Sequence, residues 1–188
     1  MAYTAFDRFL ARRRFQAAFP HVRPGSRVCD VGCGLDAAFL TYAATHISLG
    51  VGLDDQVRAG NHRPWPVIRA DITRGFPLLD AQFDHVLMLA VLEHLADPEP
   101  VLREAFRVLA PAGSLILTWP QSLVDPVLTI LHRTGFVSHE MESQEHQPRR
   151  PLDELLQILS RTGFCNFFHR RFELGMNNLF VTFKPAAR

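Results

Sequence analysis

The 188-residue sequence has little of what marks several protein classes. Its three cysteines, Cys29, Cys33 and Cys165, are an odd number without the paired spacing of a zinc site, so we expect reduced thiols. No apolar run approaches the roughly 18–20 residues of a membrane span, and charged residues interrupt the N-terminal region where a secretory signal would lie. The formal net charge of +1 gives no strong global field for nucleic acid or an anionic membrane. These absences predict a cytoplasmic protein without integral membrane association, whose partners must be argued from local sites.

What the sequence does contain is an alternation of short apolar runs and helical patterns. Strands are expected at Arg27–Val31, Ile47–Leu53, Val67–Ile68, Phe83–Ala90, Ser114–Trp119, Phe164–Leu174 and Asn177–Lys184. Helices are expected over residues 4–19, Ala37–Thr45, Pro98–Leu109 and Pro151–Thr162. Such alternation implies parallel pairing through right-handed crossovers, and the last two strands, which flank Gly175, form an antiparallel pair. The sequence predicts an α/β fold with a seven-stranded, mostly parallel sheet.

The length is enough for one domain with a substantial core and too small for two. We expect a single domain over residues 1–188 with four parts. They are an N-terminal helix or cap (1–25), a cofactor-binding core (26–120), a lid or acceptor-binding loop (121–150), and a C-terminal helix with the strand pair (151–188). A solvated connection is an equally good interpretation of 121–150, because its pattern is weak.

A glycine-rich stretch, RVCDVGCGLDAAF, follows the start of the first predicted strand. Its GCGLDA core satisfies the G-x-G-x-x-A pattern of dinucleotide-binding loops, in which glycines let the backbone approach a ligand. Asp30 precedes this loop, Asp54 follows the second strand and Asp71 follows the third. Because ligands of open α/β sheets bind outside the carboxyl ends of the strands, we expect three carboxylates around one crevice.

The charge of these acids bears on which ligand the loop holds. A pyrophosphate about 4–5 Å from Asp30 would meet a repulsion of roughly 3–4 kcal/mol per contact at an effective dielectric near 20. S-adenosylmethionine has no phosphate, and its sulfonium, ammonium, ribose hydroxyls and adenine amine all suit acceptors. The three acids together favour S-adenosylmethionine over NAD, although any one of them is as well explained by a turn or a helix cap.

Four stretches carry a family resemblance: VCDVGCG, GVGLDD, RADI and FDHVLMLAVLEHLADPEPVLREAFRVLAPAGSLILTWP. Together they resemble the class I S-adenosylmethionine-dependent methyltransferases, especially the small-molecule group that includes the ubiquinone and menaquinone biosynthesis enzymes. The resemblance implies a Rossmann-like, doubly wound sheet and S-adenosylmethionine as the cofactor. It also implies in-line methyl transfer to a small-molecule acceptor, for which a hydroxyl oxygen is expected.

The resemblance also assigns residues to the cofactor by position. It implies contacts from Asp30, Gly32, Cys33 and Gly34 to the methionine end, from Asp54 and Asp55 to the ribose, from Asp71 and Ile72 to the adenine, and from the backbone of Leu89 and Ala90 to the methionine moiety. The family's third loop glycine is replaced by Asp36, which would either crowd the ligand or cap the next helix. No metal is expected, because Ala90 stands where some quinone-pathway relatives have a glutamate proposed to help hold one.

Three histidines are candidates for a general base. His94 follows the fourth strand, near the expected methyl position, while His139 and His146 lie in the 121–150 segment. A metal-binding face would need one continuous helix through His132, His139, Glu142 and His146. Gly135 argues against that continuity.

Two other functions stay open beside methyl transfer. The GCGLDA loop is compatible with an NAD-linked oxidoreductase, which Asp30 disfavours. The loss of a loop glycine at Asp36 is compatible with a non-catalytic module that binds an adenosyl ligand or a protein. We expect a small-molecule acceptor as the partner and no nucleic acid, because no basic stripe interleaved with aromatic residues occurs. The sequence leaves the oligomeric state open.

Overall fold

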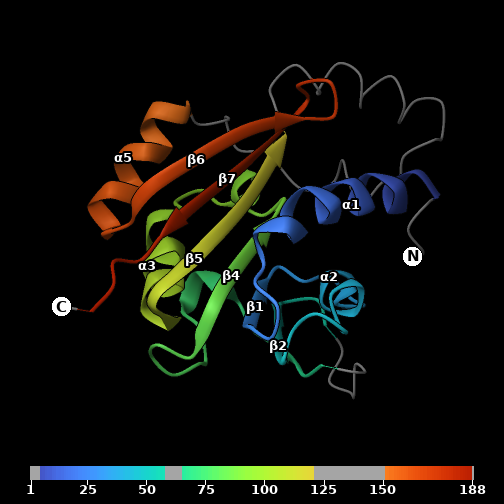
Figure 1. The fold of residues 1–188 in the computed structure, drawn as a ribbon, viewed down its shortest axis with the longest axis horizontal. Coiled ribbons are helices and arrows are strands. Elements are labelled where there is room, and N and C mark those ends of the chain that lie inside the picture. Colours follow the sequence, from blue (N-terminus) through green and yellow to red (C-terminus); the bar gives the residue numbers. More distant parts are fainter. Residues whose placement is uncertain (1–4, 58–64, 121–150, 188) are drawn as a thin grey trace.

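The computed structural model describes residues 5–57, 65–120 and 151–187. Their strands form a seven-stranded sheet in the order β3-β2-β1-β4-β5-β7-β6 (Figure 1). Five strands are parallel: β1 (Arg27–Val31), β2 (Leu49–Asp54), β3 (Val67–Arg69), β4 (Phe83–Leu89) and β5 (Leu109–Pro120). The remaining two, β6 (Cys165–Phe172) and β7 (Asn177–Phe183), pair antiparallel, and β7 is antiparallel to β5. The predicted mixed sheet is confirmed.

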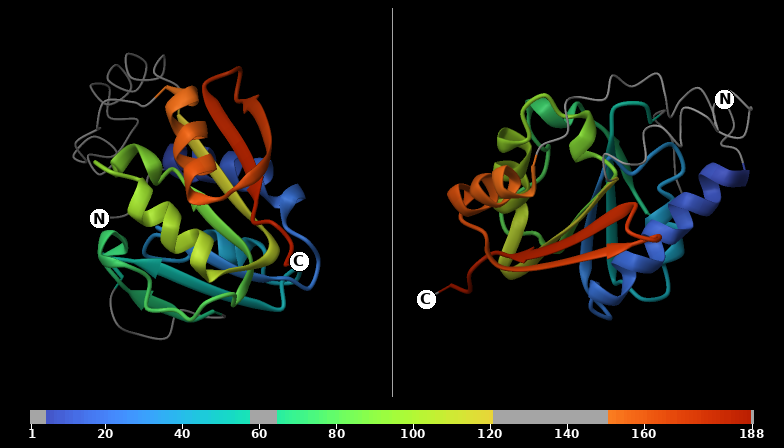
Figure 2. Two further views of the ribbon diagram at one scale, coloured as in Figure 1. Left: turned by 90° about the vertical axis from the view of Figure 1, so that its left-hand side faces the viewer. Right: turned by 90° about the horizontal axis from the view of Figure 1, so that it is seen from above.

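Helices cover both faces of this sheet, as a doubly wound fold requires (Figures 1 and 2). One face carries α1 (Ala5–Ala18) and α2 (Ala38–Tyr42), and the other carries α3 (Glu99–Val108) and α5 (Leu152–Thr162). Two apolar clusters result, one under each helical layer. The chain also contains the short 3-10 helices η1 (Phe19–His21), η2 (Ile72–Arg74) and η3 (Leu92–His94). Among the described helices, none combines the length and the apolar character needed to cross a bilayer.

The strand order reverses at β1, which lies between β2 and β4. Asp30 of β1 is in register with Gly52 of β2 and with Leu87 of β4. The chain therefore leaves β1 and β4 toward opposite faces, and the crevice between them is where open α/β sheets bind ligands.

The element boundaries agree with the prediction to within two residues except at two places. Helix α2 spans Ala38–Tyr42 and is shorter than the predicted 37–45. Strand β5 begins at Leu109 instead of 114, because Leu109 already pairs with Phe83 of β4. The predicted lid over 121–150 lies outside the described residues.

Candidate functional site

The loop after β1 has the backbone shape that its two glycines allow. Gly32 and Gly34 have φ of +70° and +71°, in the left-handed region. The Gly32 and Cys33 N–H groups both donate to the Leu53 carbonyl of β2, at 2.7 and 3.2 Å. A Cβ at Gly32 would lie 2.6 Å from Cγ2 of Val91. Glycine is therefore required at this position by conformation and by contact.

Cys33 contributes to the loop differently from its neighbours. Its side chain is 9% exposed and belongs to the apolar cluster beneath α1 and α2. A Cβ on Gly52 of β2 would come within 2.6 Å of the Cys33 sulfur, so the thiol fills the space above that glycine. Burial and the nearby Asp30 carboxylate raise the pKa of the Cys33 thiol. Only the backbone of Cys33 remains available to a ligand. The glycine at position 52 leaves room for the thiol, and it is the feature of the sequence from which the inward orientation of Cys33 could have been inferred.

Asp54, the last residue of β2, ties the glycine loop to that strand. One carboxylate oxygen accepts from the Gly34 N–H at 2.9 Å, and the other accepts from the Gln56 N–H at 2.9 Å. The carboxylate thus stands at the mouth of the crevice with lone pairs left for a hydroxyl donor. Its neighbour Asp55 is exposed, and its carbonyl accepts from Arg69.

Asp30 is the buried acid of the site, with 3% of its surface exposed. No described residue donates a hydrogen bond or forms an ion pair with its carboxyl group. Burial first, and then the charge of Asp54, raise the pKa of Asp30 to about 8. A buried carboxyl without a partner suits a cationic ligand, which would replace the lost hydration.

Asp71 plays the structural role that a single aspartate after a strand often has. It is the N-cap of η2, where one oxygen accepts from the N–H and hydroxyl of Thr73 at 3.0 and 2.6 Å. The other oxygen pairs with Arg74 at 3.1 Å, and hydrogen bonds from Thr73 chiefly lower the pKa of Asp71. Ile72 packs at the border of the core. Both residues stay predictions as adenine contacts.

Asp36, which stands in place of the family's third glycine, is exposed and does not cap the helix. Helix α2 has Ala37 as its N-cap, and no side chain makes a cap hydrogen bond there. Of the two alternatives for Asp36, crowding of the ligand or capping of the next helix, the capping of α2 is therefore wrong. Ala37 itself has φ of +44°, so the left-handed position of this loop falls on an alanine.

The end of β4 forms the other wall of the crevice. Leu89 ends the strand, and Ala90 has φ of +61° while its N–H donates to the Thr118 carbonyl at 2.9 Å. Val91 then packs on Gly32, a contact that the sequence alone did not indicate. His94 is exposed at the end of η3. His139 and His146 lie outside the described residues, as does the whole metal face considered above.

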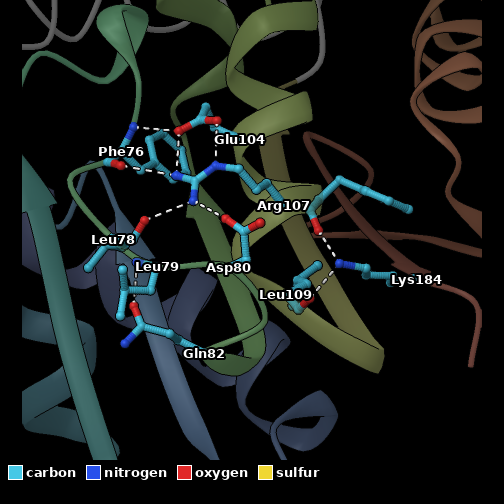
Figure 3. A network of polar contacts seen from close by, with 10 residues as sticks. Phe76, Leu78, Leu79, Asp80, Gln82, Glu104, Arg107, Leu109 and Lys184 are labelled. Carbon is cyan, nitrogen blue, oxygen red and sulfur yellow. Dashed lines mark hydrogen bonds and ion pairs between the residues drawn. The ribbon is translucent and has the colours of Figure 1, made fainter. Parts of the chain in front are cut away.

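One strongly patterned part of the sequence proves to be structural. Arg107 of α3 binds Glu104, Asp80 and the carbonyls of Phe76 and Leu78, at distances of 2.6–3.0 Å (Figure 3). This network fastens the loop before β4 to α3, at the amino ends of the strands. The L-R-E-A-F-R-V-L run therefore supports the sheet from the edge opposite the glycine loop.

Comparison with known proteins finds similarity to methyltransferases. Residues 29–117 match the family described as methyltransferase domain. The 27-O-demethylrifamycin SV methyltransferase of Amycolatopsis mediterranei is 32% identical over 109 residues, which cover 51% of this chain and 39% of that protein. The demethylmenaquinone methyltransferase of Tropheryma whipplei is 26% identical over 182 residues, which cover 87% of this chain and 76% of that protein. The chain spans only 31% to 47% of the length of four curated relatives that it matches.

The fold is shared with solved structures. A protein of Thermotoga maritima, described as an S-adenosylmethionine-dependent methyltransferase and possible histamine N-methyltransferase, has a TM-score of 0.70 at 19% identity. The alignment covers 94% of this chain and 90% of that one. The family match over residues 29–117, the motifs at the carboxyl edge of the sheet and the shared fold together make the chain similar to the class I S-adenosylmethionine-dependent methyltransferases.

Proposed function

We propose that the protein transfers a methyl group from S-adenosylmethionine to a hydroxyl oxygen of a small-molecule acceptor. The observation that carries this proposal is Asp30, a buried carboxyl behind the glycine loop to which no described residue donates a hydrogen bond. The ionised form of this group would repel a phosphate-bearing dinucleotide, whereas a cationic nucleoside would favour that form. The oxygen acceptor rests on the curated relatives, which include a 27-O-demethylrifamycin SV methyltransferase and a ubiquinone biosynthesis O-methyltransferase.

The residues of the crevice fit such a cofactor in their donor and acceptor character. Asp30 would face its cationic methionine end, and the backbone of Gly32, Cys33 and Gly34 would line it. Asp54 would accept from the ribose hydroxyls while it holds Gly34 in place. The bound cofactor supplies a methyl group already activated on a sulfonium, so the chain needs above all to orient its two ligands.

Orientation accounts for most of what the protein must contribute. Holding an acceptor oxygen in line with the methyl carbon can supply about 7–11 kcal/mol of the barrier. A general base would add about 10²–10⁴-fold by removing the hydroxyl proton. His94 is our candidate among the described residues, because η3 follows directly after the β4 wall of the crevice.

Calorimetric titration of S-adenosylmethionine, S-adenosylhomocysteine and NAD tests the cofactor assignment. Wild type is expected to bind both adenosyl ligands and not NAD. Asp54→Asn should weaken binding about tenfold or more, because its amide replaces a charged acceptor. Asp153→Asn, an exposed acid at the start of α5, is the matched control and should bind as wild type. Binding of NAD alone would refute the proposal.

Labelled methyl transfer to a panel of phenols, catechols and sugars tests the acceptor. Wild type should label hydroxyl compounds, and His94→Gln should lower kcat at unchanged cofactor affinity. Cofactor binding without labelling of any compound in the panel, or labelling of amines alone, would contradict the oxygen acceptor.

A further inference from the structure

Helix α1 presents a basic face that the core does not use. The exposed residues between positions 8 and 16 are Arg8, Phe9, Arg12, Arg13 and Gln16. At about 100° per residue they fall on one continuous side of the helix. Phe15 and Ala18, which lie outside this side, pack into the apolar cluster of that face of the sheet. Phe9 is nevertheless 57% exposed in the middle of the basic side.

The turn between β6 and β7 places a leucine where folding gains nothing from it. The Gly175 N–H donates to the Phe172 carbonyl, and the two residues between them, Glu173 and Leu174, have φ of +52° and +54°. Hairpin turns of this shape favour glycine or asparagine, because other side chains are strained there. The Leu174 side chain is completely exposed, at 101%. Local strain without a packing reward points to a functional role.

These two features lie side by side (Figure 2). The Arg13 guanidinium is 4.0 Å from the Glu173 carboxylate, and the rings of His21 and Phe168 are 5.3 Å apart. Arg170, also exposed, lies in register with Leu179, whose side chain is on the α1 face of the sheet. The turn is also next to the carboxyl end of β5, since Asn177 pairs with Pro120. The combined surface therefore belongs to the same edge as the glycine loop.

We propose that this basic tip surface, formed by Arg8, Phe9, Arg12, Arg13, Arg170 and Leu174, docks on the face of an anionic lipid bilayer. Basic side chains attract anionic headgroups, while an exposed apolar side chain enters the boundary with the acyl chains. Glu173, which is an acid next to the surface, has a side chain only 7% exposed. Docking would turn the carboxyl edge of the sheet toward the membrane.

Other occupants fit the surface less well. A second copy of the chain would bring arginines against arginines in a symmetric contact. Single-stranded nucleic acid could use the arginines and stack on Phe9, but an aliphatic side chain at the most exposed point gives no stacking platform. The proposal goes beyond methyl transfer and does not depend on it.

Cosedimentation of the full chain with vesicles tests the docking. The protein should bind vesicles of phosphatidylcholine and phosphatidylglycerol in equal parts and should not bind phosphatidylcholine alone. Binding should weaken as salt rises, because the headgroup attraction is screened. Failure to bind the anionic vesicles refutes the proposal. Binding of polyuridylate without binding of vesicles would identify a nucleic-acid surface instead.

Leu174→Asn separates docking from folding, because asparagine tolerates positive φ. Its melting temperature should equal or exceed that of wild type, while the vesicle partition coefficient falls about tenfold or more through the lost apolar anchor. Leu79→Asn removes a leucine that is 74% exposed just before β4, at the opposite edge of the sheet, and should leave binding unchanged. Equal effects of the two substitutions, or none from Leu174→Asn, would overturn the assignment.

Discussion

The carboxyl group of Asp30 is expected to hold a proton in the free protein at pH 7. Burial and the neighbouring Asp54 carboxylate raise the pKa of Asp30 to about 8. At that pKa, about one molecule in ten has an ionised Asp30 at pH 7. A cationic ligand favours the ionised form, so the binding of S-adenosylmethionine should displace this proton.

The expected size of this coupling follows from linkage. Below pH 8 the affinity for S-adenosylmethionine should rise about tenfold per pH unit, and about 0.9 proton should leave per ligand bound at pH 7. Asp30→Asn preserves the shape of the side chain and removes the titration. Its affinity should be lower above pH 8 and should not change between pH 6 and pH 8.

Titration calorimetry at pH 7 in phosphate and in Tris measures the released protons directly, because the two buffers differ in their heat of ionisation. Wild type should show the buffer-dependent enthalpy and Asp30→Asn should not. A wild-type enthalpy that is independent of buffer would refute the reasoning. So would equal proton release from both proteins, which would assign the proton to another group.

The same carboxyl should affect folding stability. Its pKa in the folded protein lies above the value of 3.8 for the free side chain, so its protonated form is favoured by folding. The contribution of protonated Asp30 to the free energy of unfolding is therefore complete below pH 4 and is lost as the pH rises toward 8. The loss is on the order of 4 kcal/mol at pH 7. Asp30→Asn should accordingly raise the melting temperature more at pH 8 than at pH 5.

Three further predictions concern other parts of the molecule. Gly32→Ala should lower cofactor affinity about tenfold or more and reduce stability, because the added Cβ would meet Val91 at 2.6 Å. The control is Gly25→Ala, which has nearly the same φ but nothing within 4 Å of the added Cβ. It should reduce stability only through backbone strain and leave the cofactor affinity measured by calorimetry unchanged. Burial lowers the pKa of His85 to about 4, so folding favours its neutral form. The stabilisation from this neutral form is complete above pH 6.5 and is lost as the pH falls toward 4. Urea unfolding of wild type should therefore show a decrease of about 3 kcal/mol in the free energy of unfolding over this range, which His85→Gln should not show. Arg107→Ala should lower the free energy of unfolding by about 2–3 kcal/mol without changing cofactor affinity, and a larger effect on affinity than on stability would contradict its structural role.

The sequence predicted the sheet well because buried parallel strands appear as apolar runs. Arg27–Val31 has the predicted limits, and every other described strand was found within a few residues of its expected place. The start of β5 was missed because residues 110–113, A-P-A-G, do not have an apolar strand pattern. Their neighbour Leu109 joins the strand through pairing with β4, which only the tertiary fold determines.

The site was predictable in position but not in detail. The carboxyl ends of parallel strands share one edge, so Asp30 and Asp54 had to lie near the glycine loop. Which acids would be buried, bonded to the loop or used as caps depends on side-chain orientation, and the sequence could not distinguish Asp30 from Asp71 in this respect. The inward direction of Cys33 follows from the shape of the loop, which has no periodicity to predict it.

The pairing of Cys33 with Gly52 makes these two positions share a single volume. A methyl group added on the strand must be matched by the removal of the sulfur from the loop, as in Cys33→Gly with Gly52→Ala, and neither exchange is neutral by itself. During evolution or redesign the floor of the crevice can therefore change only by paired replacements. The packing of β2 against the glycine loop thus limits which loop sequences can replace the one in this chain.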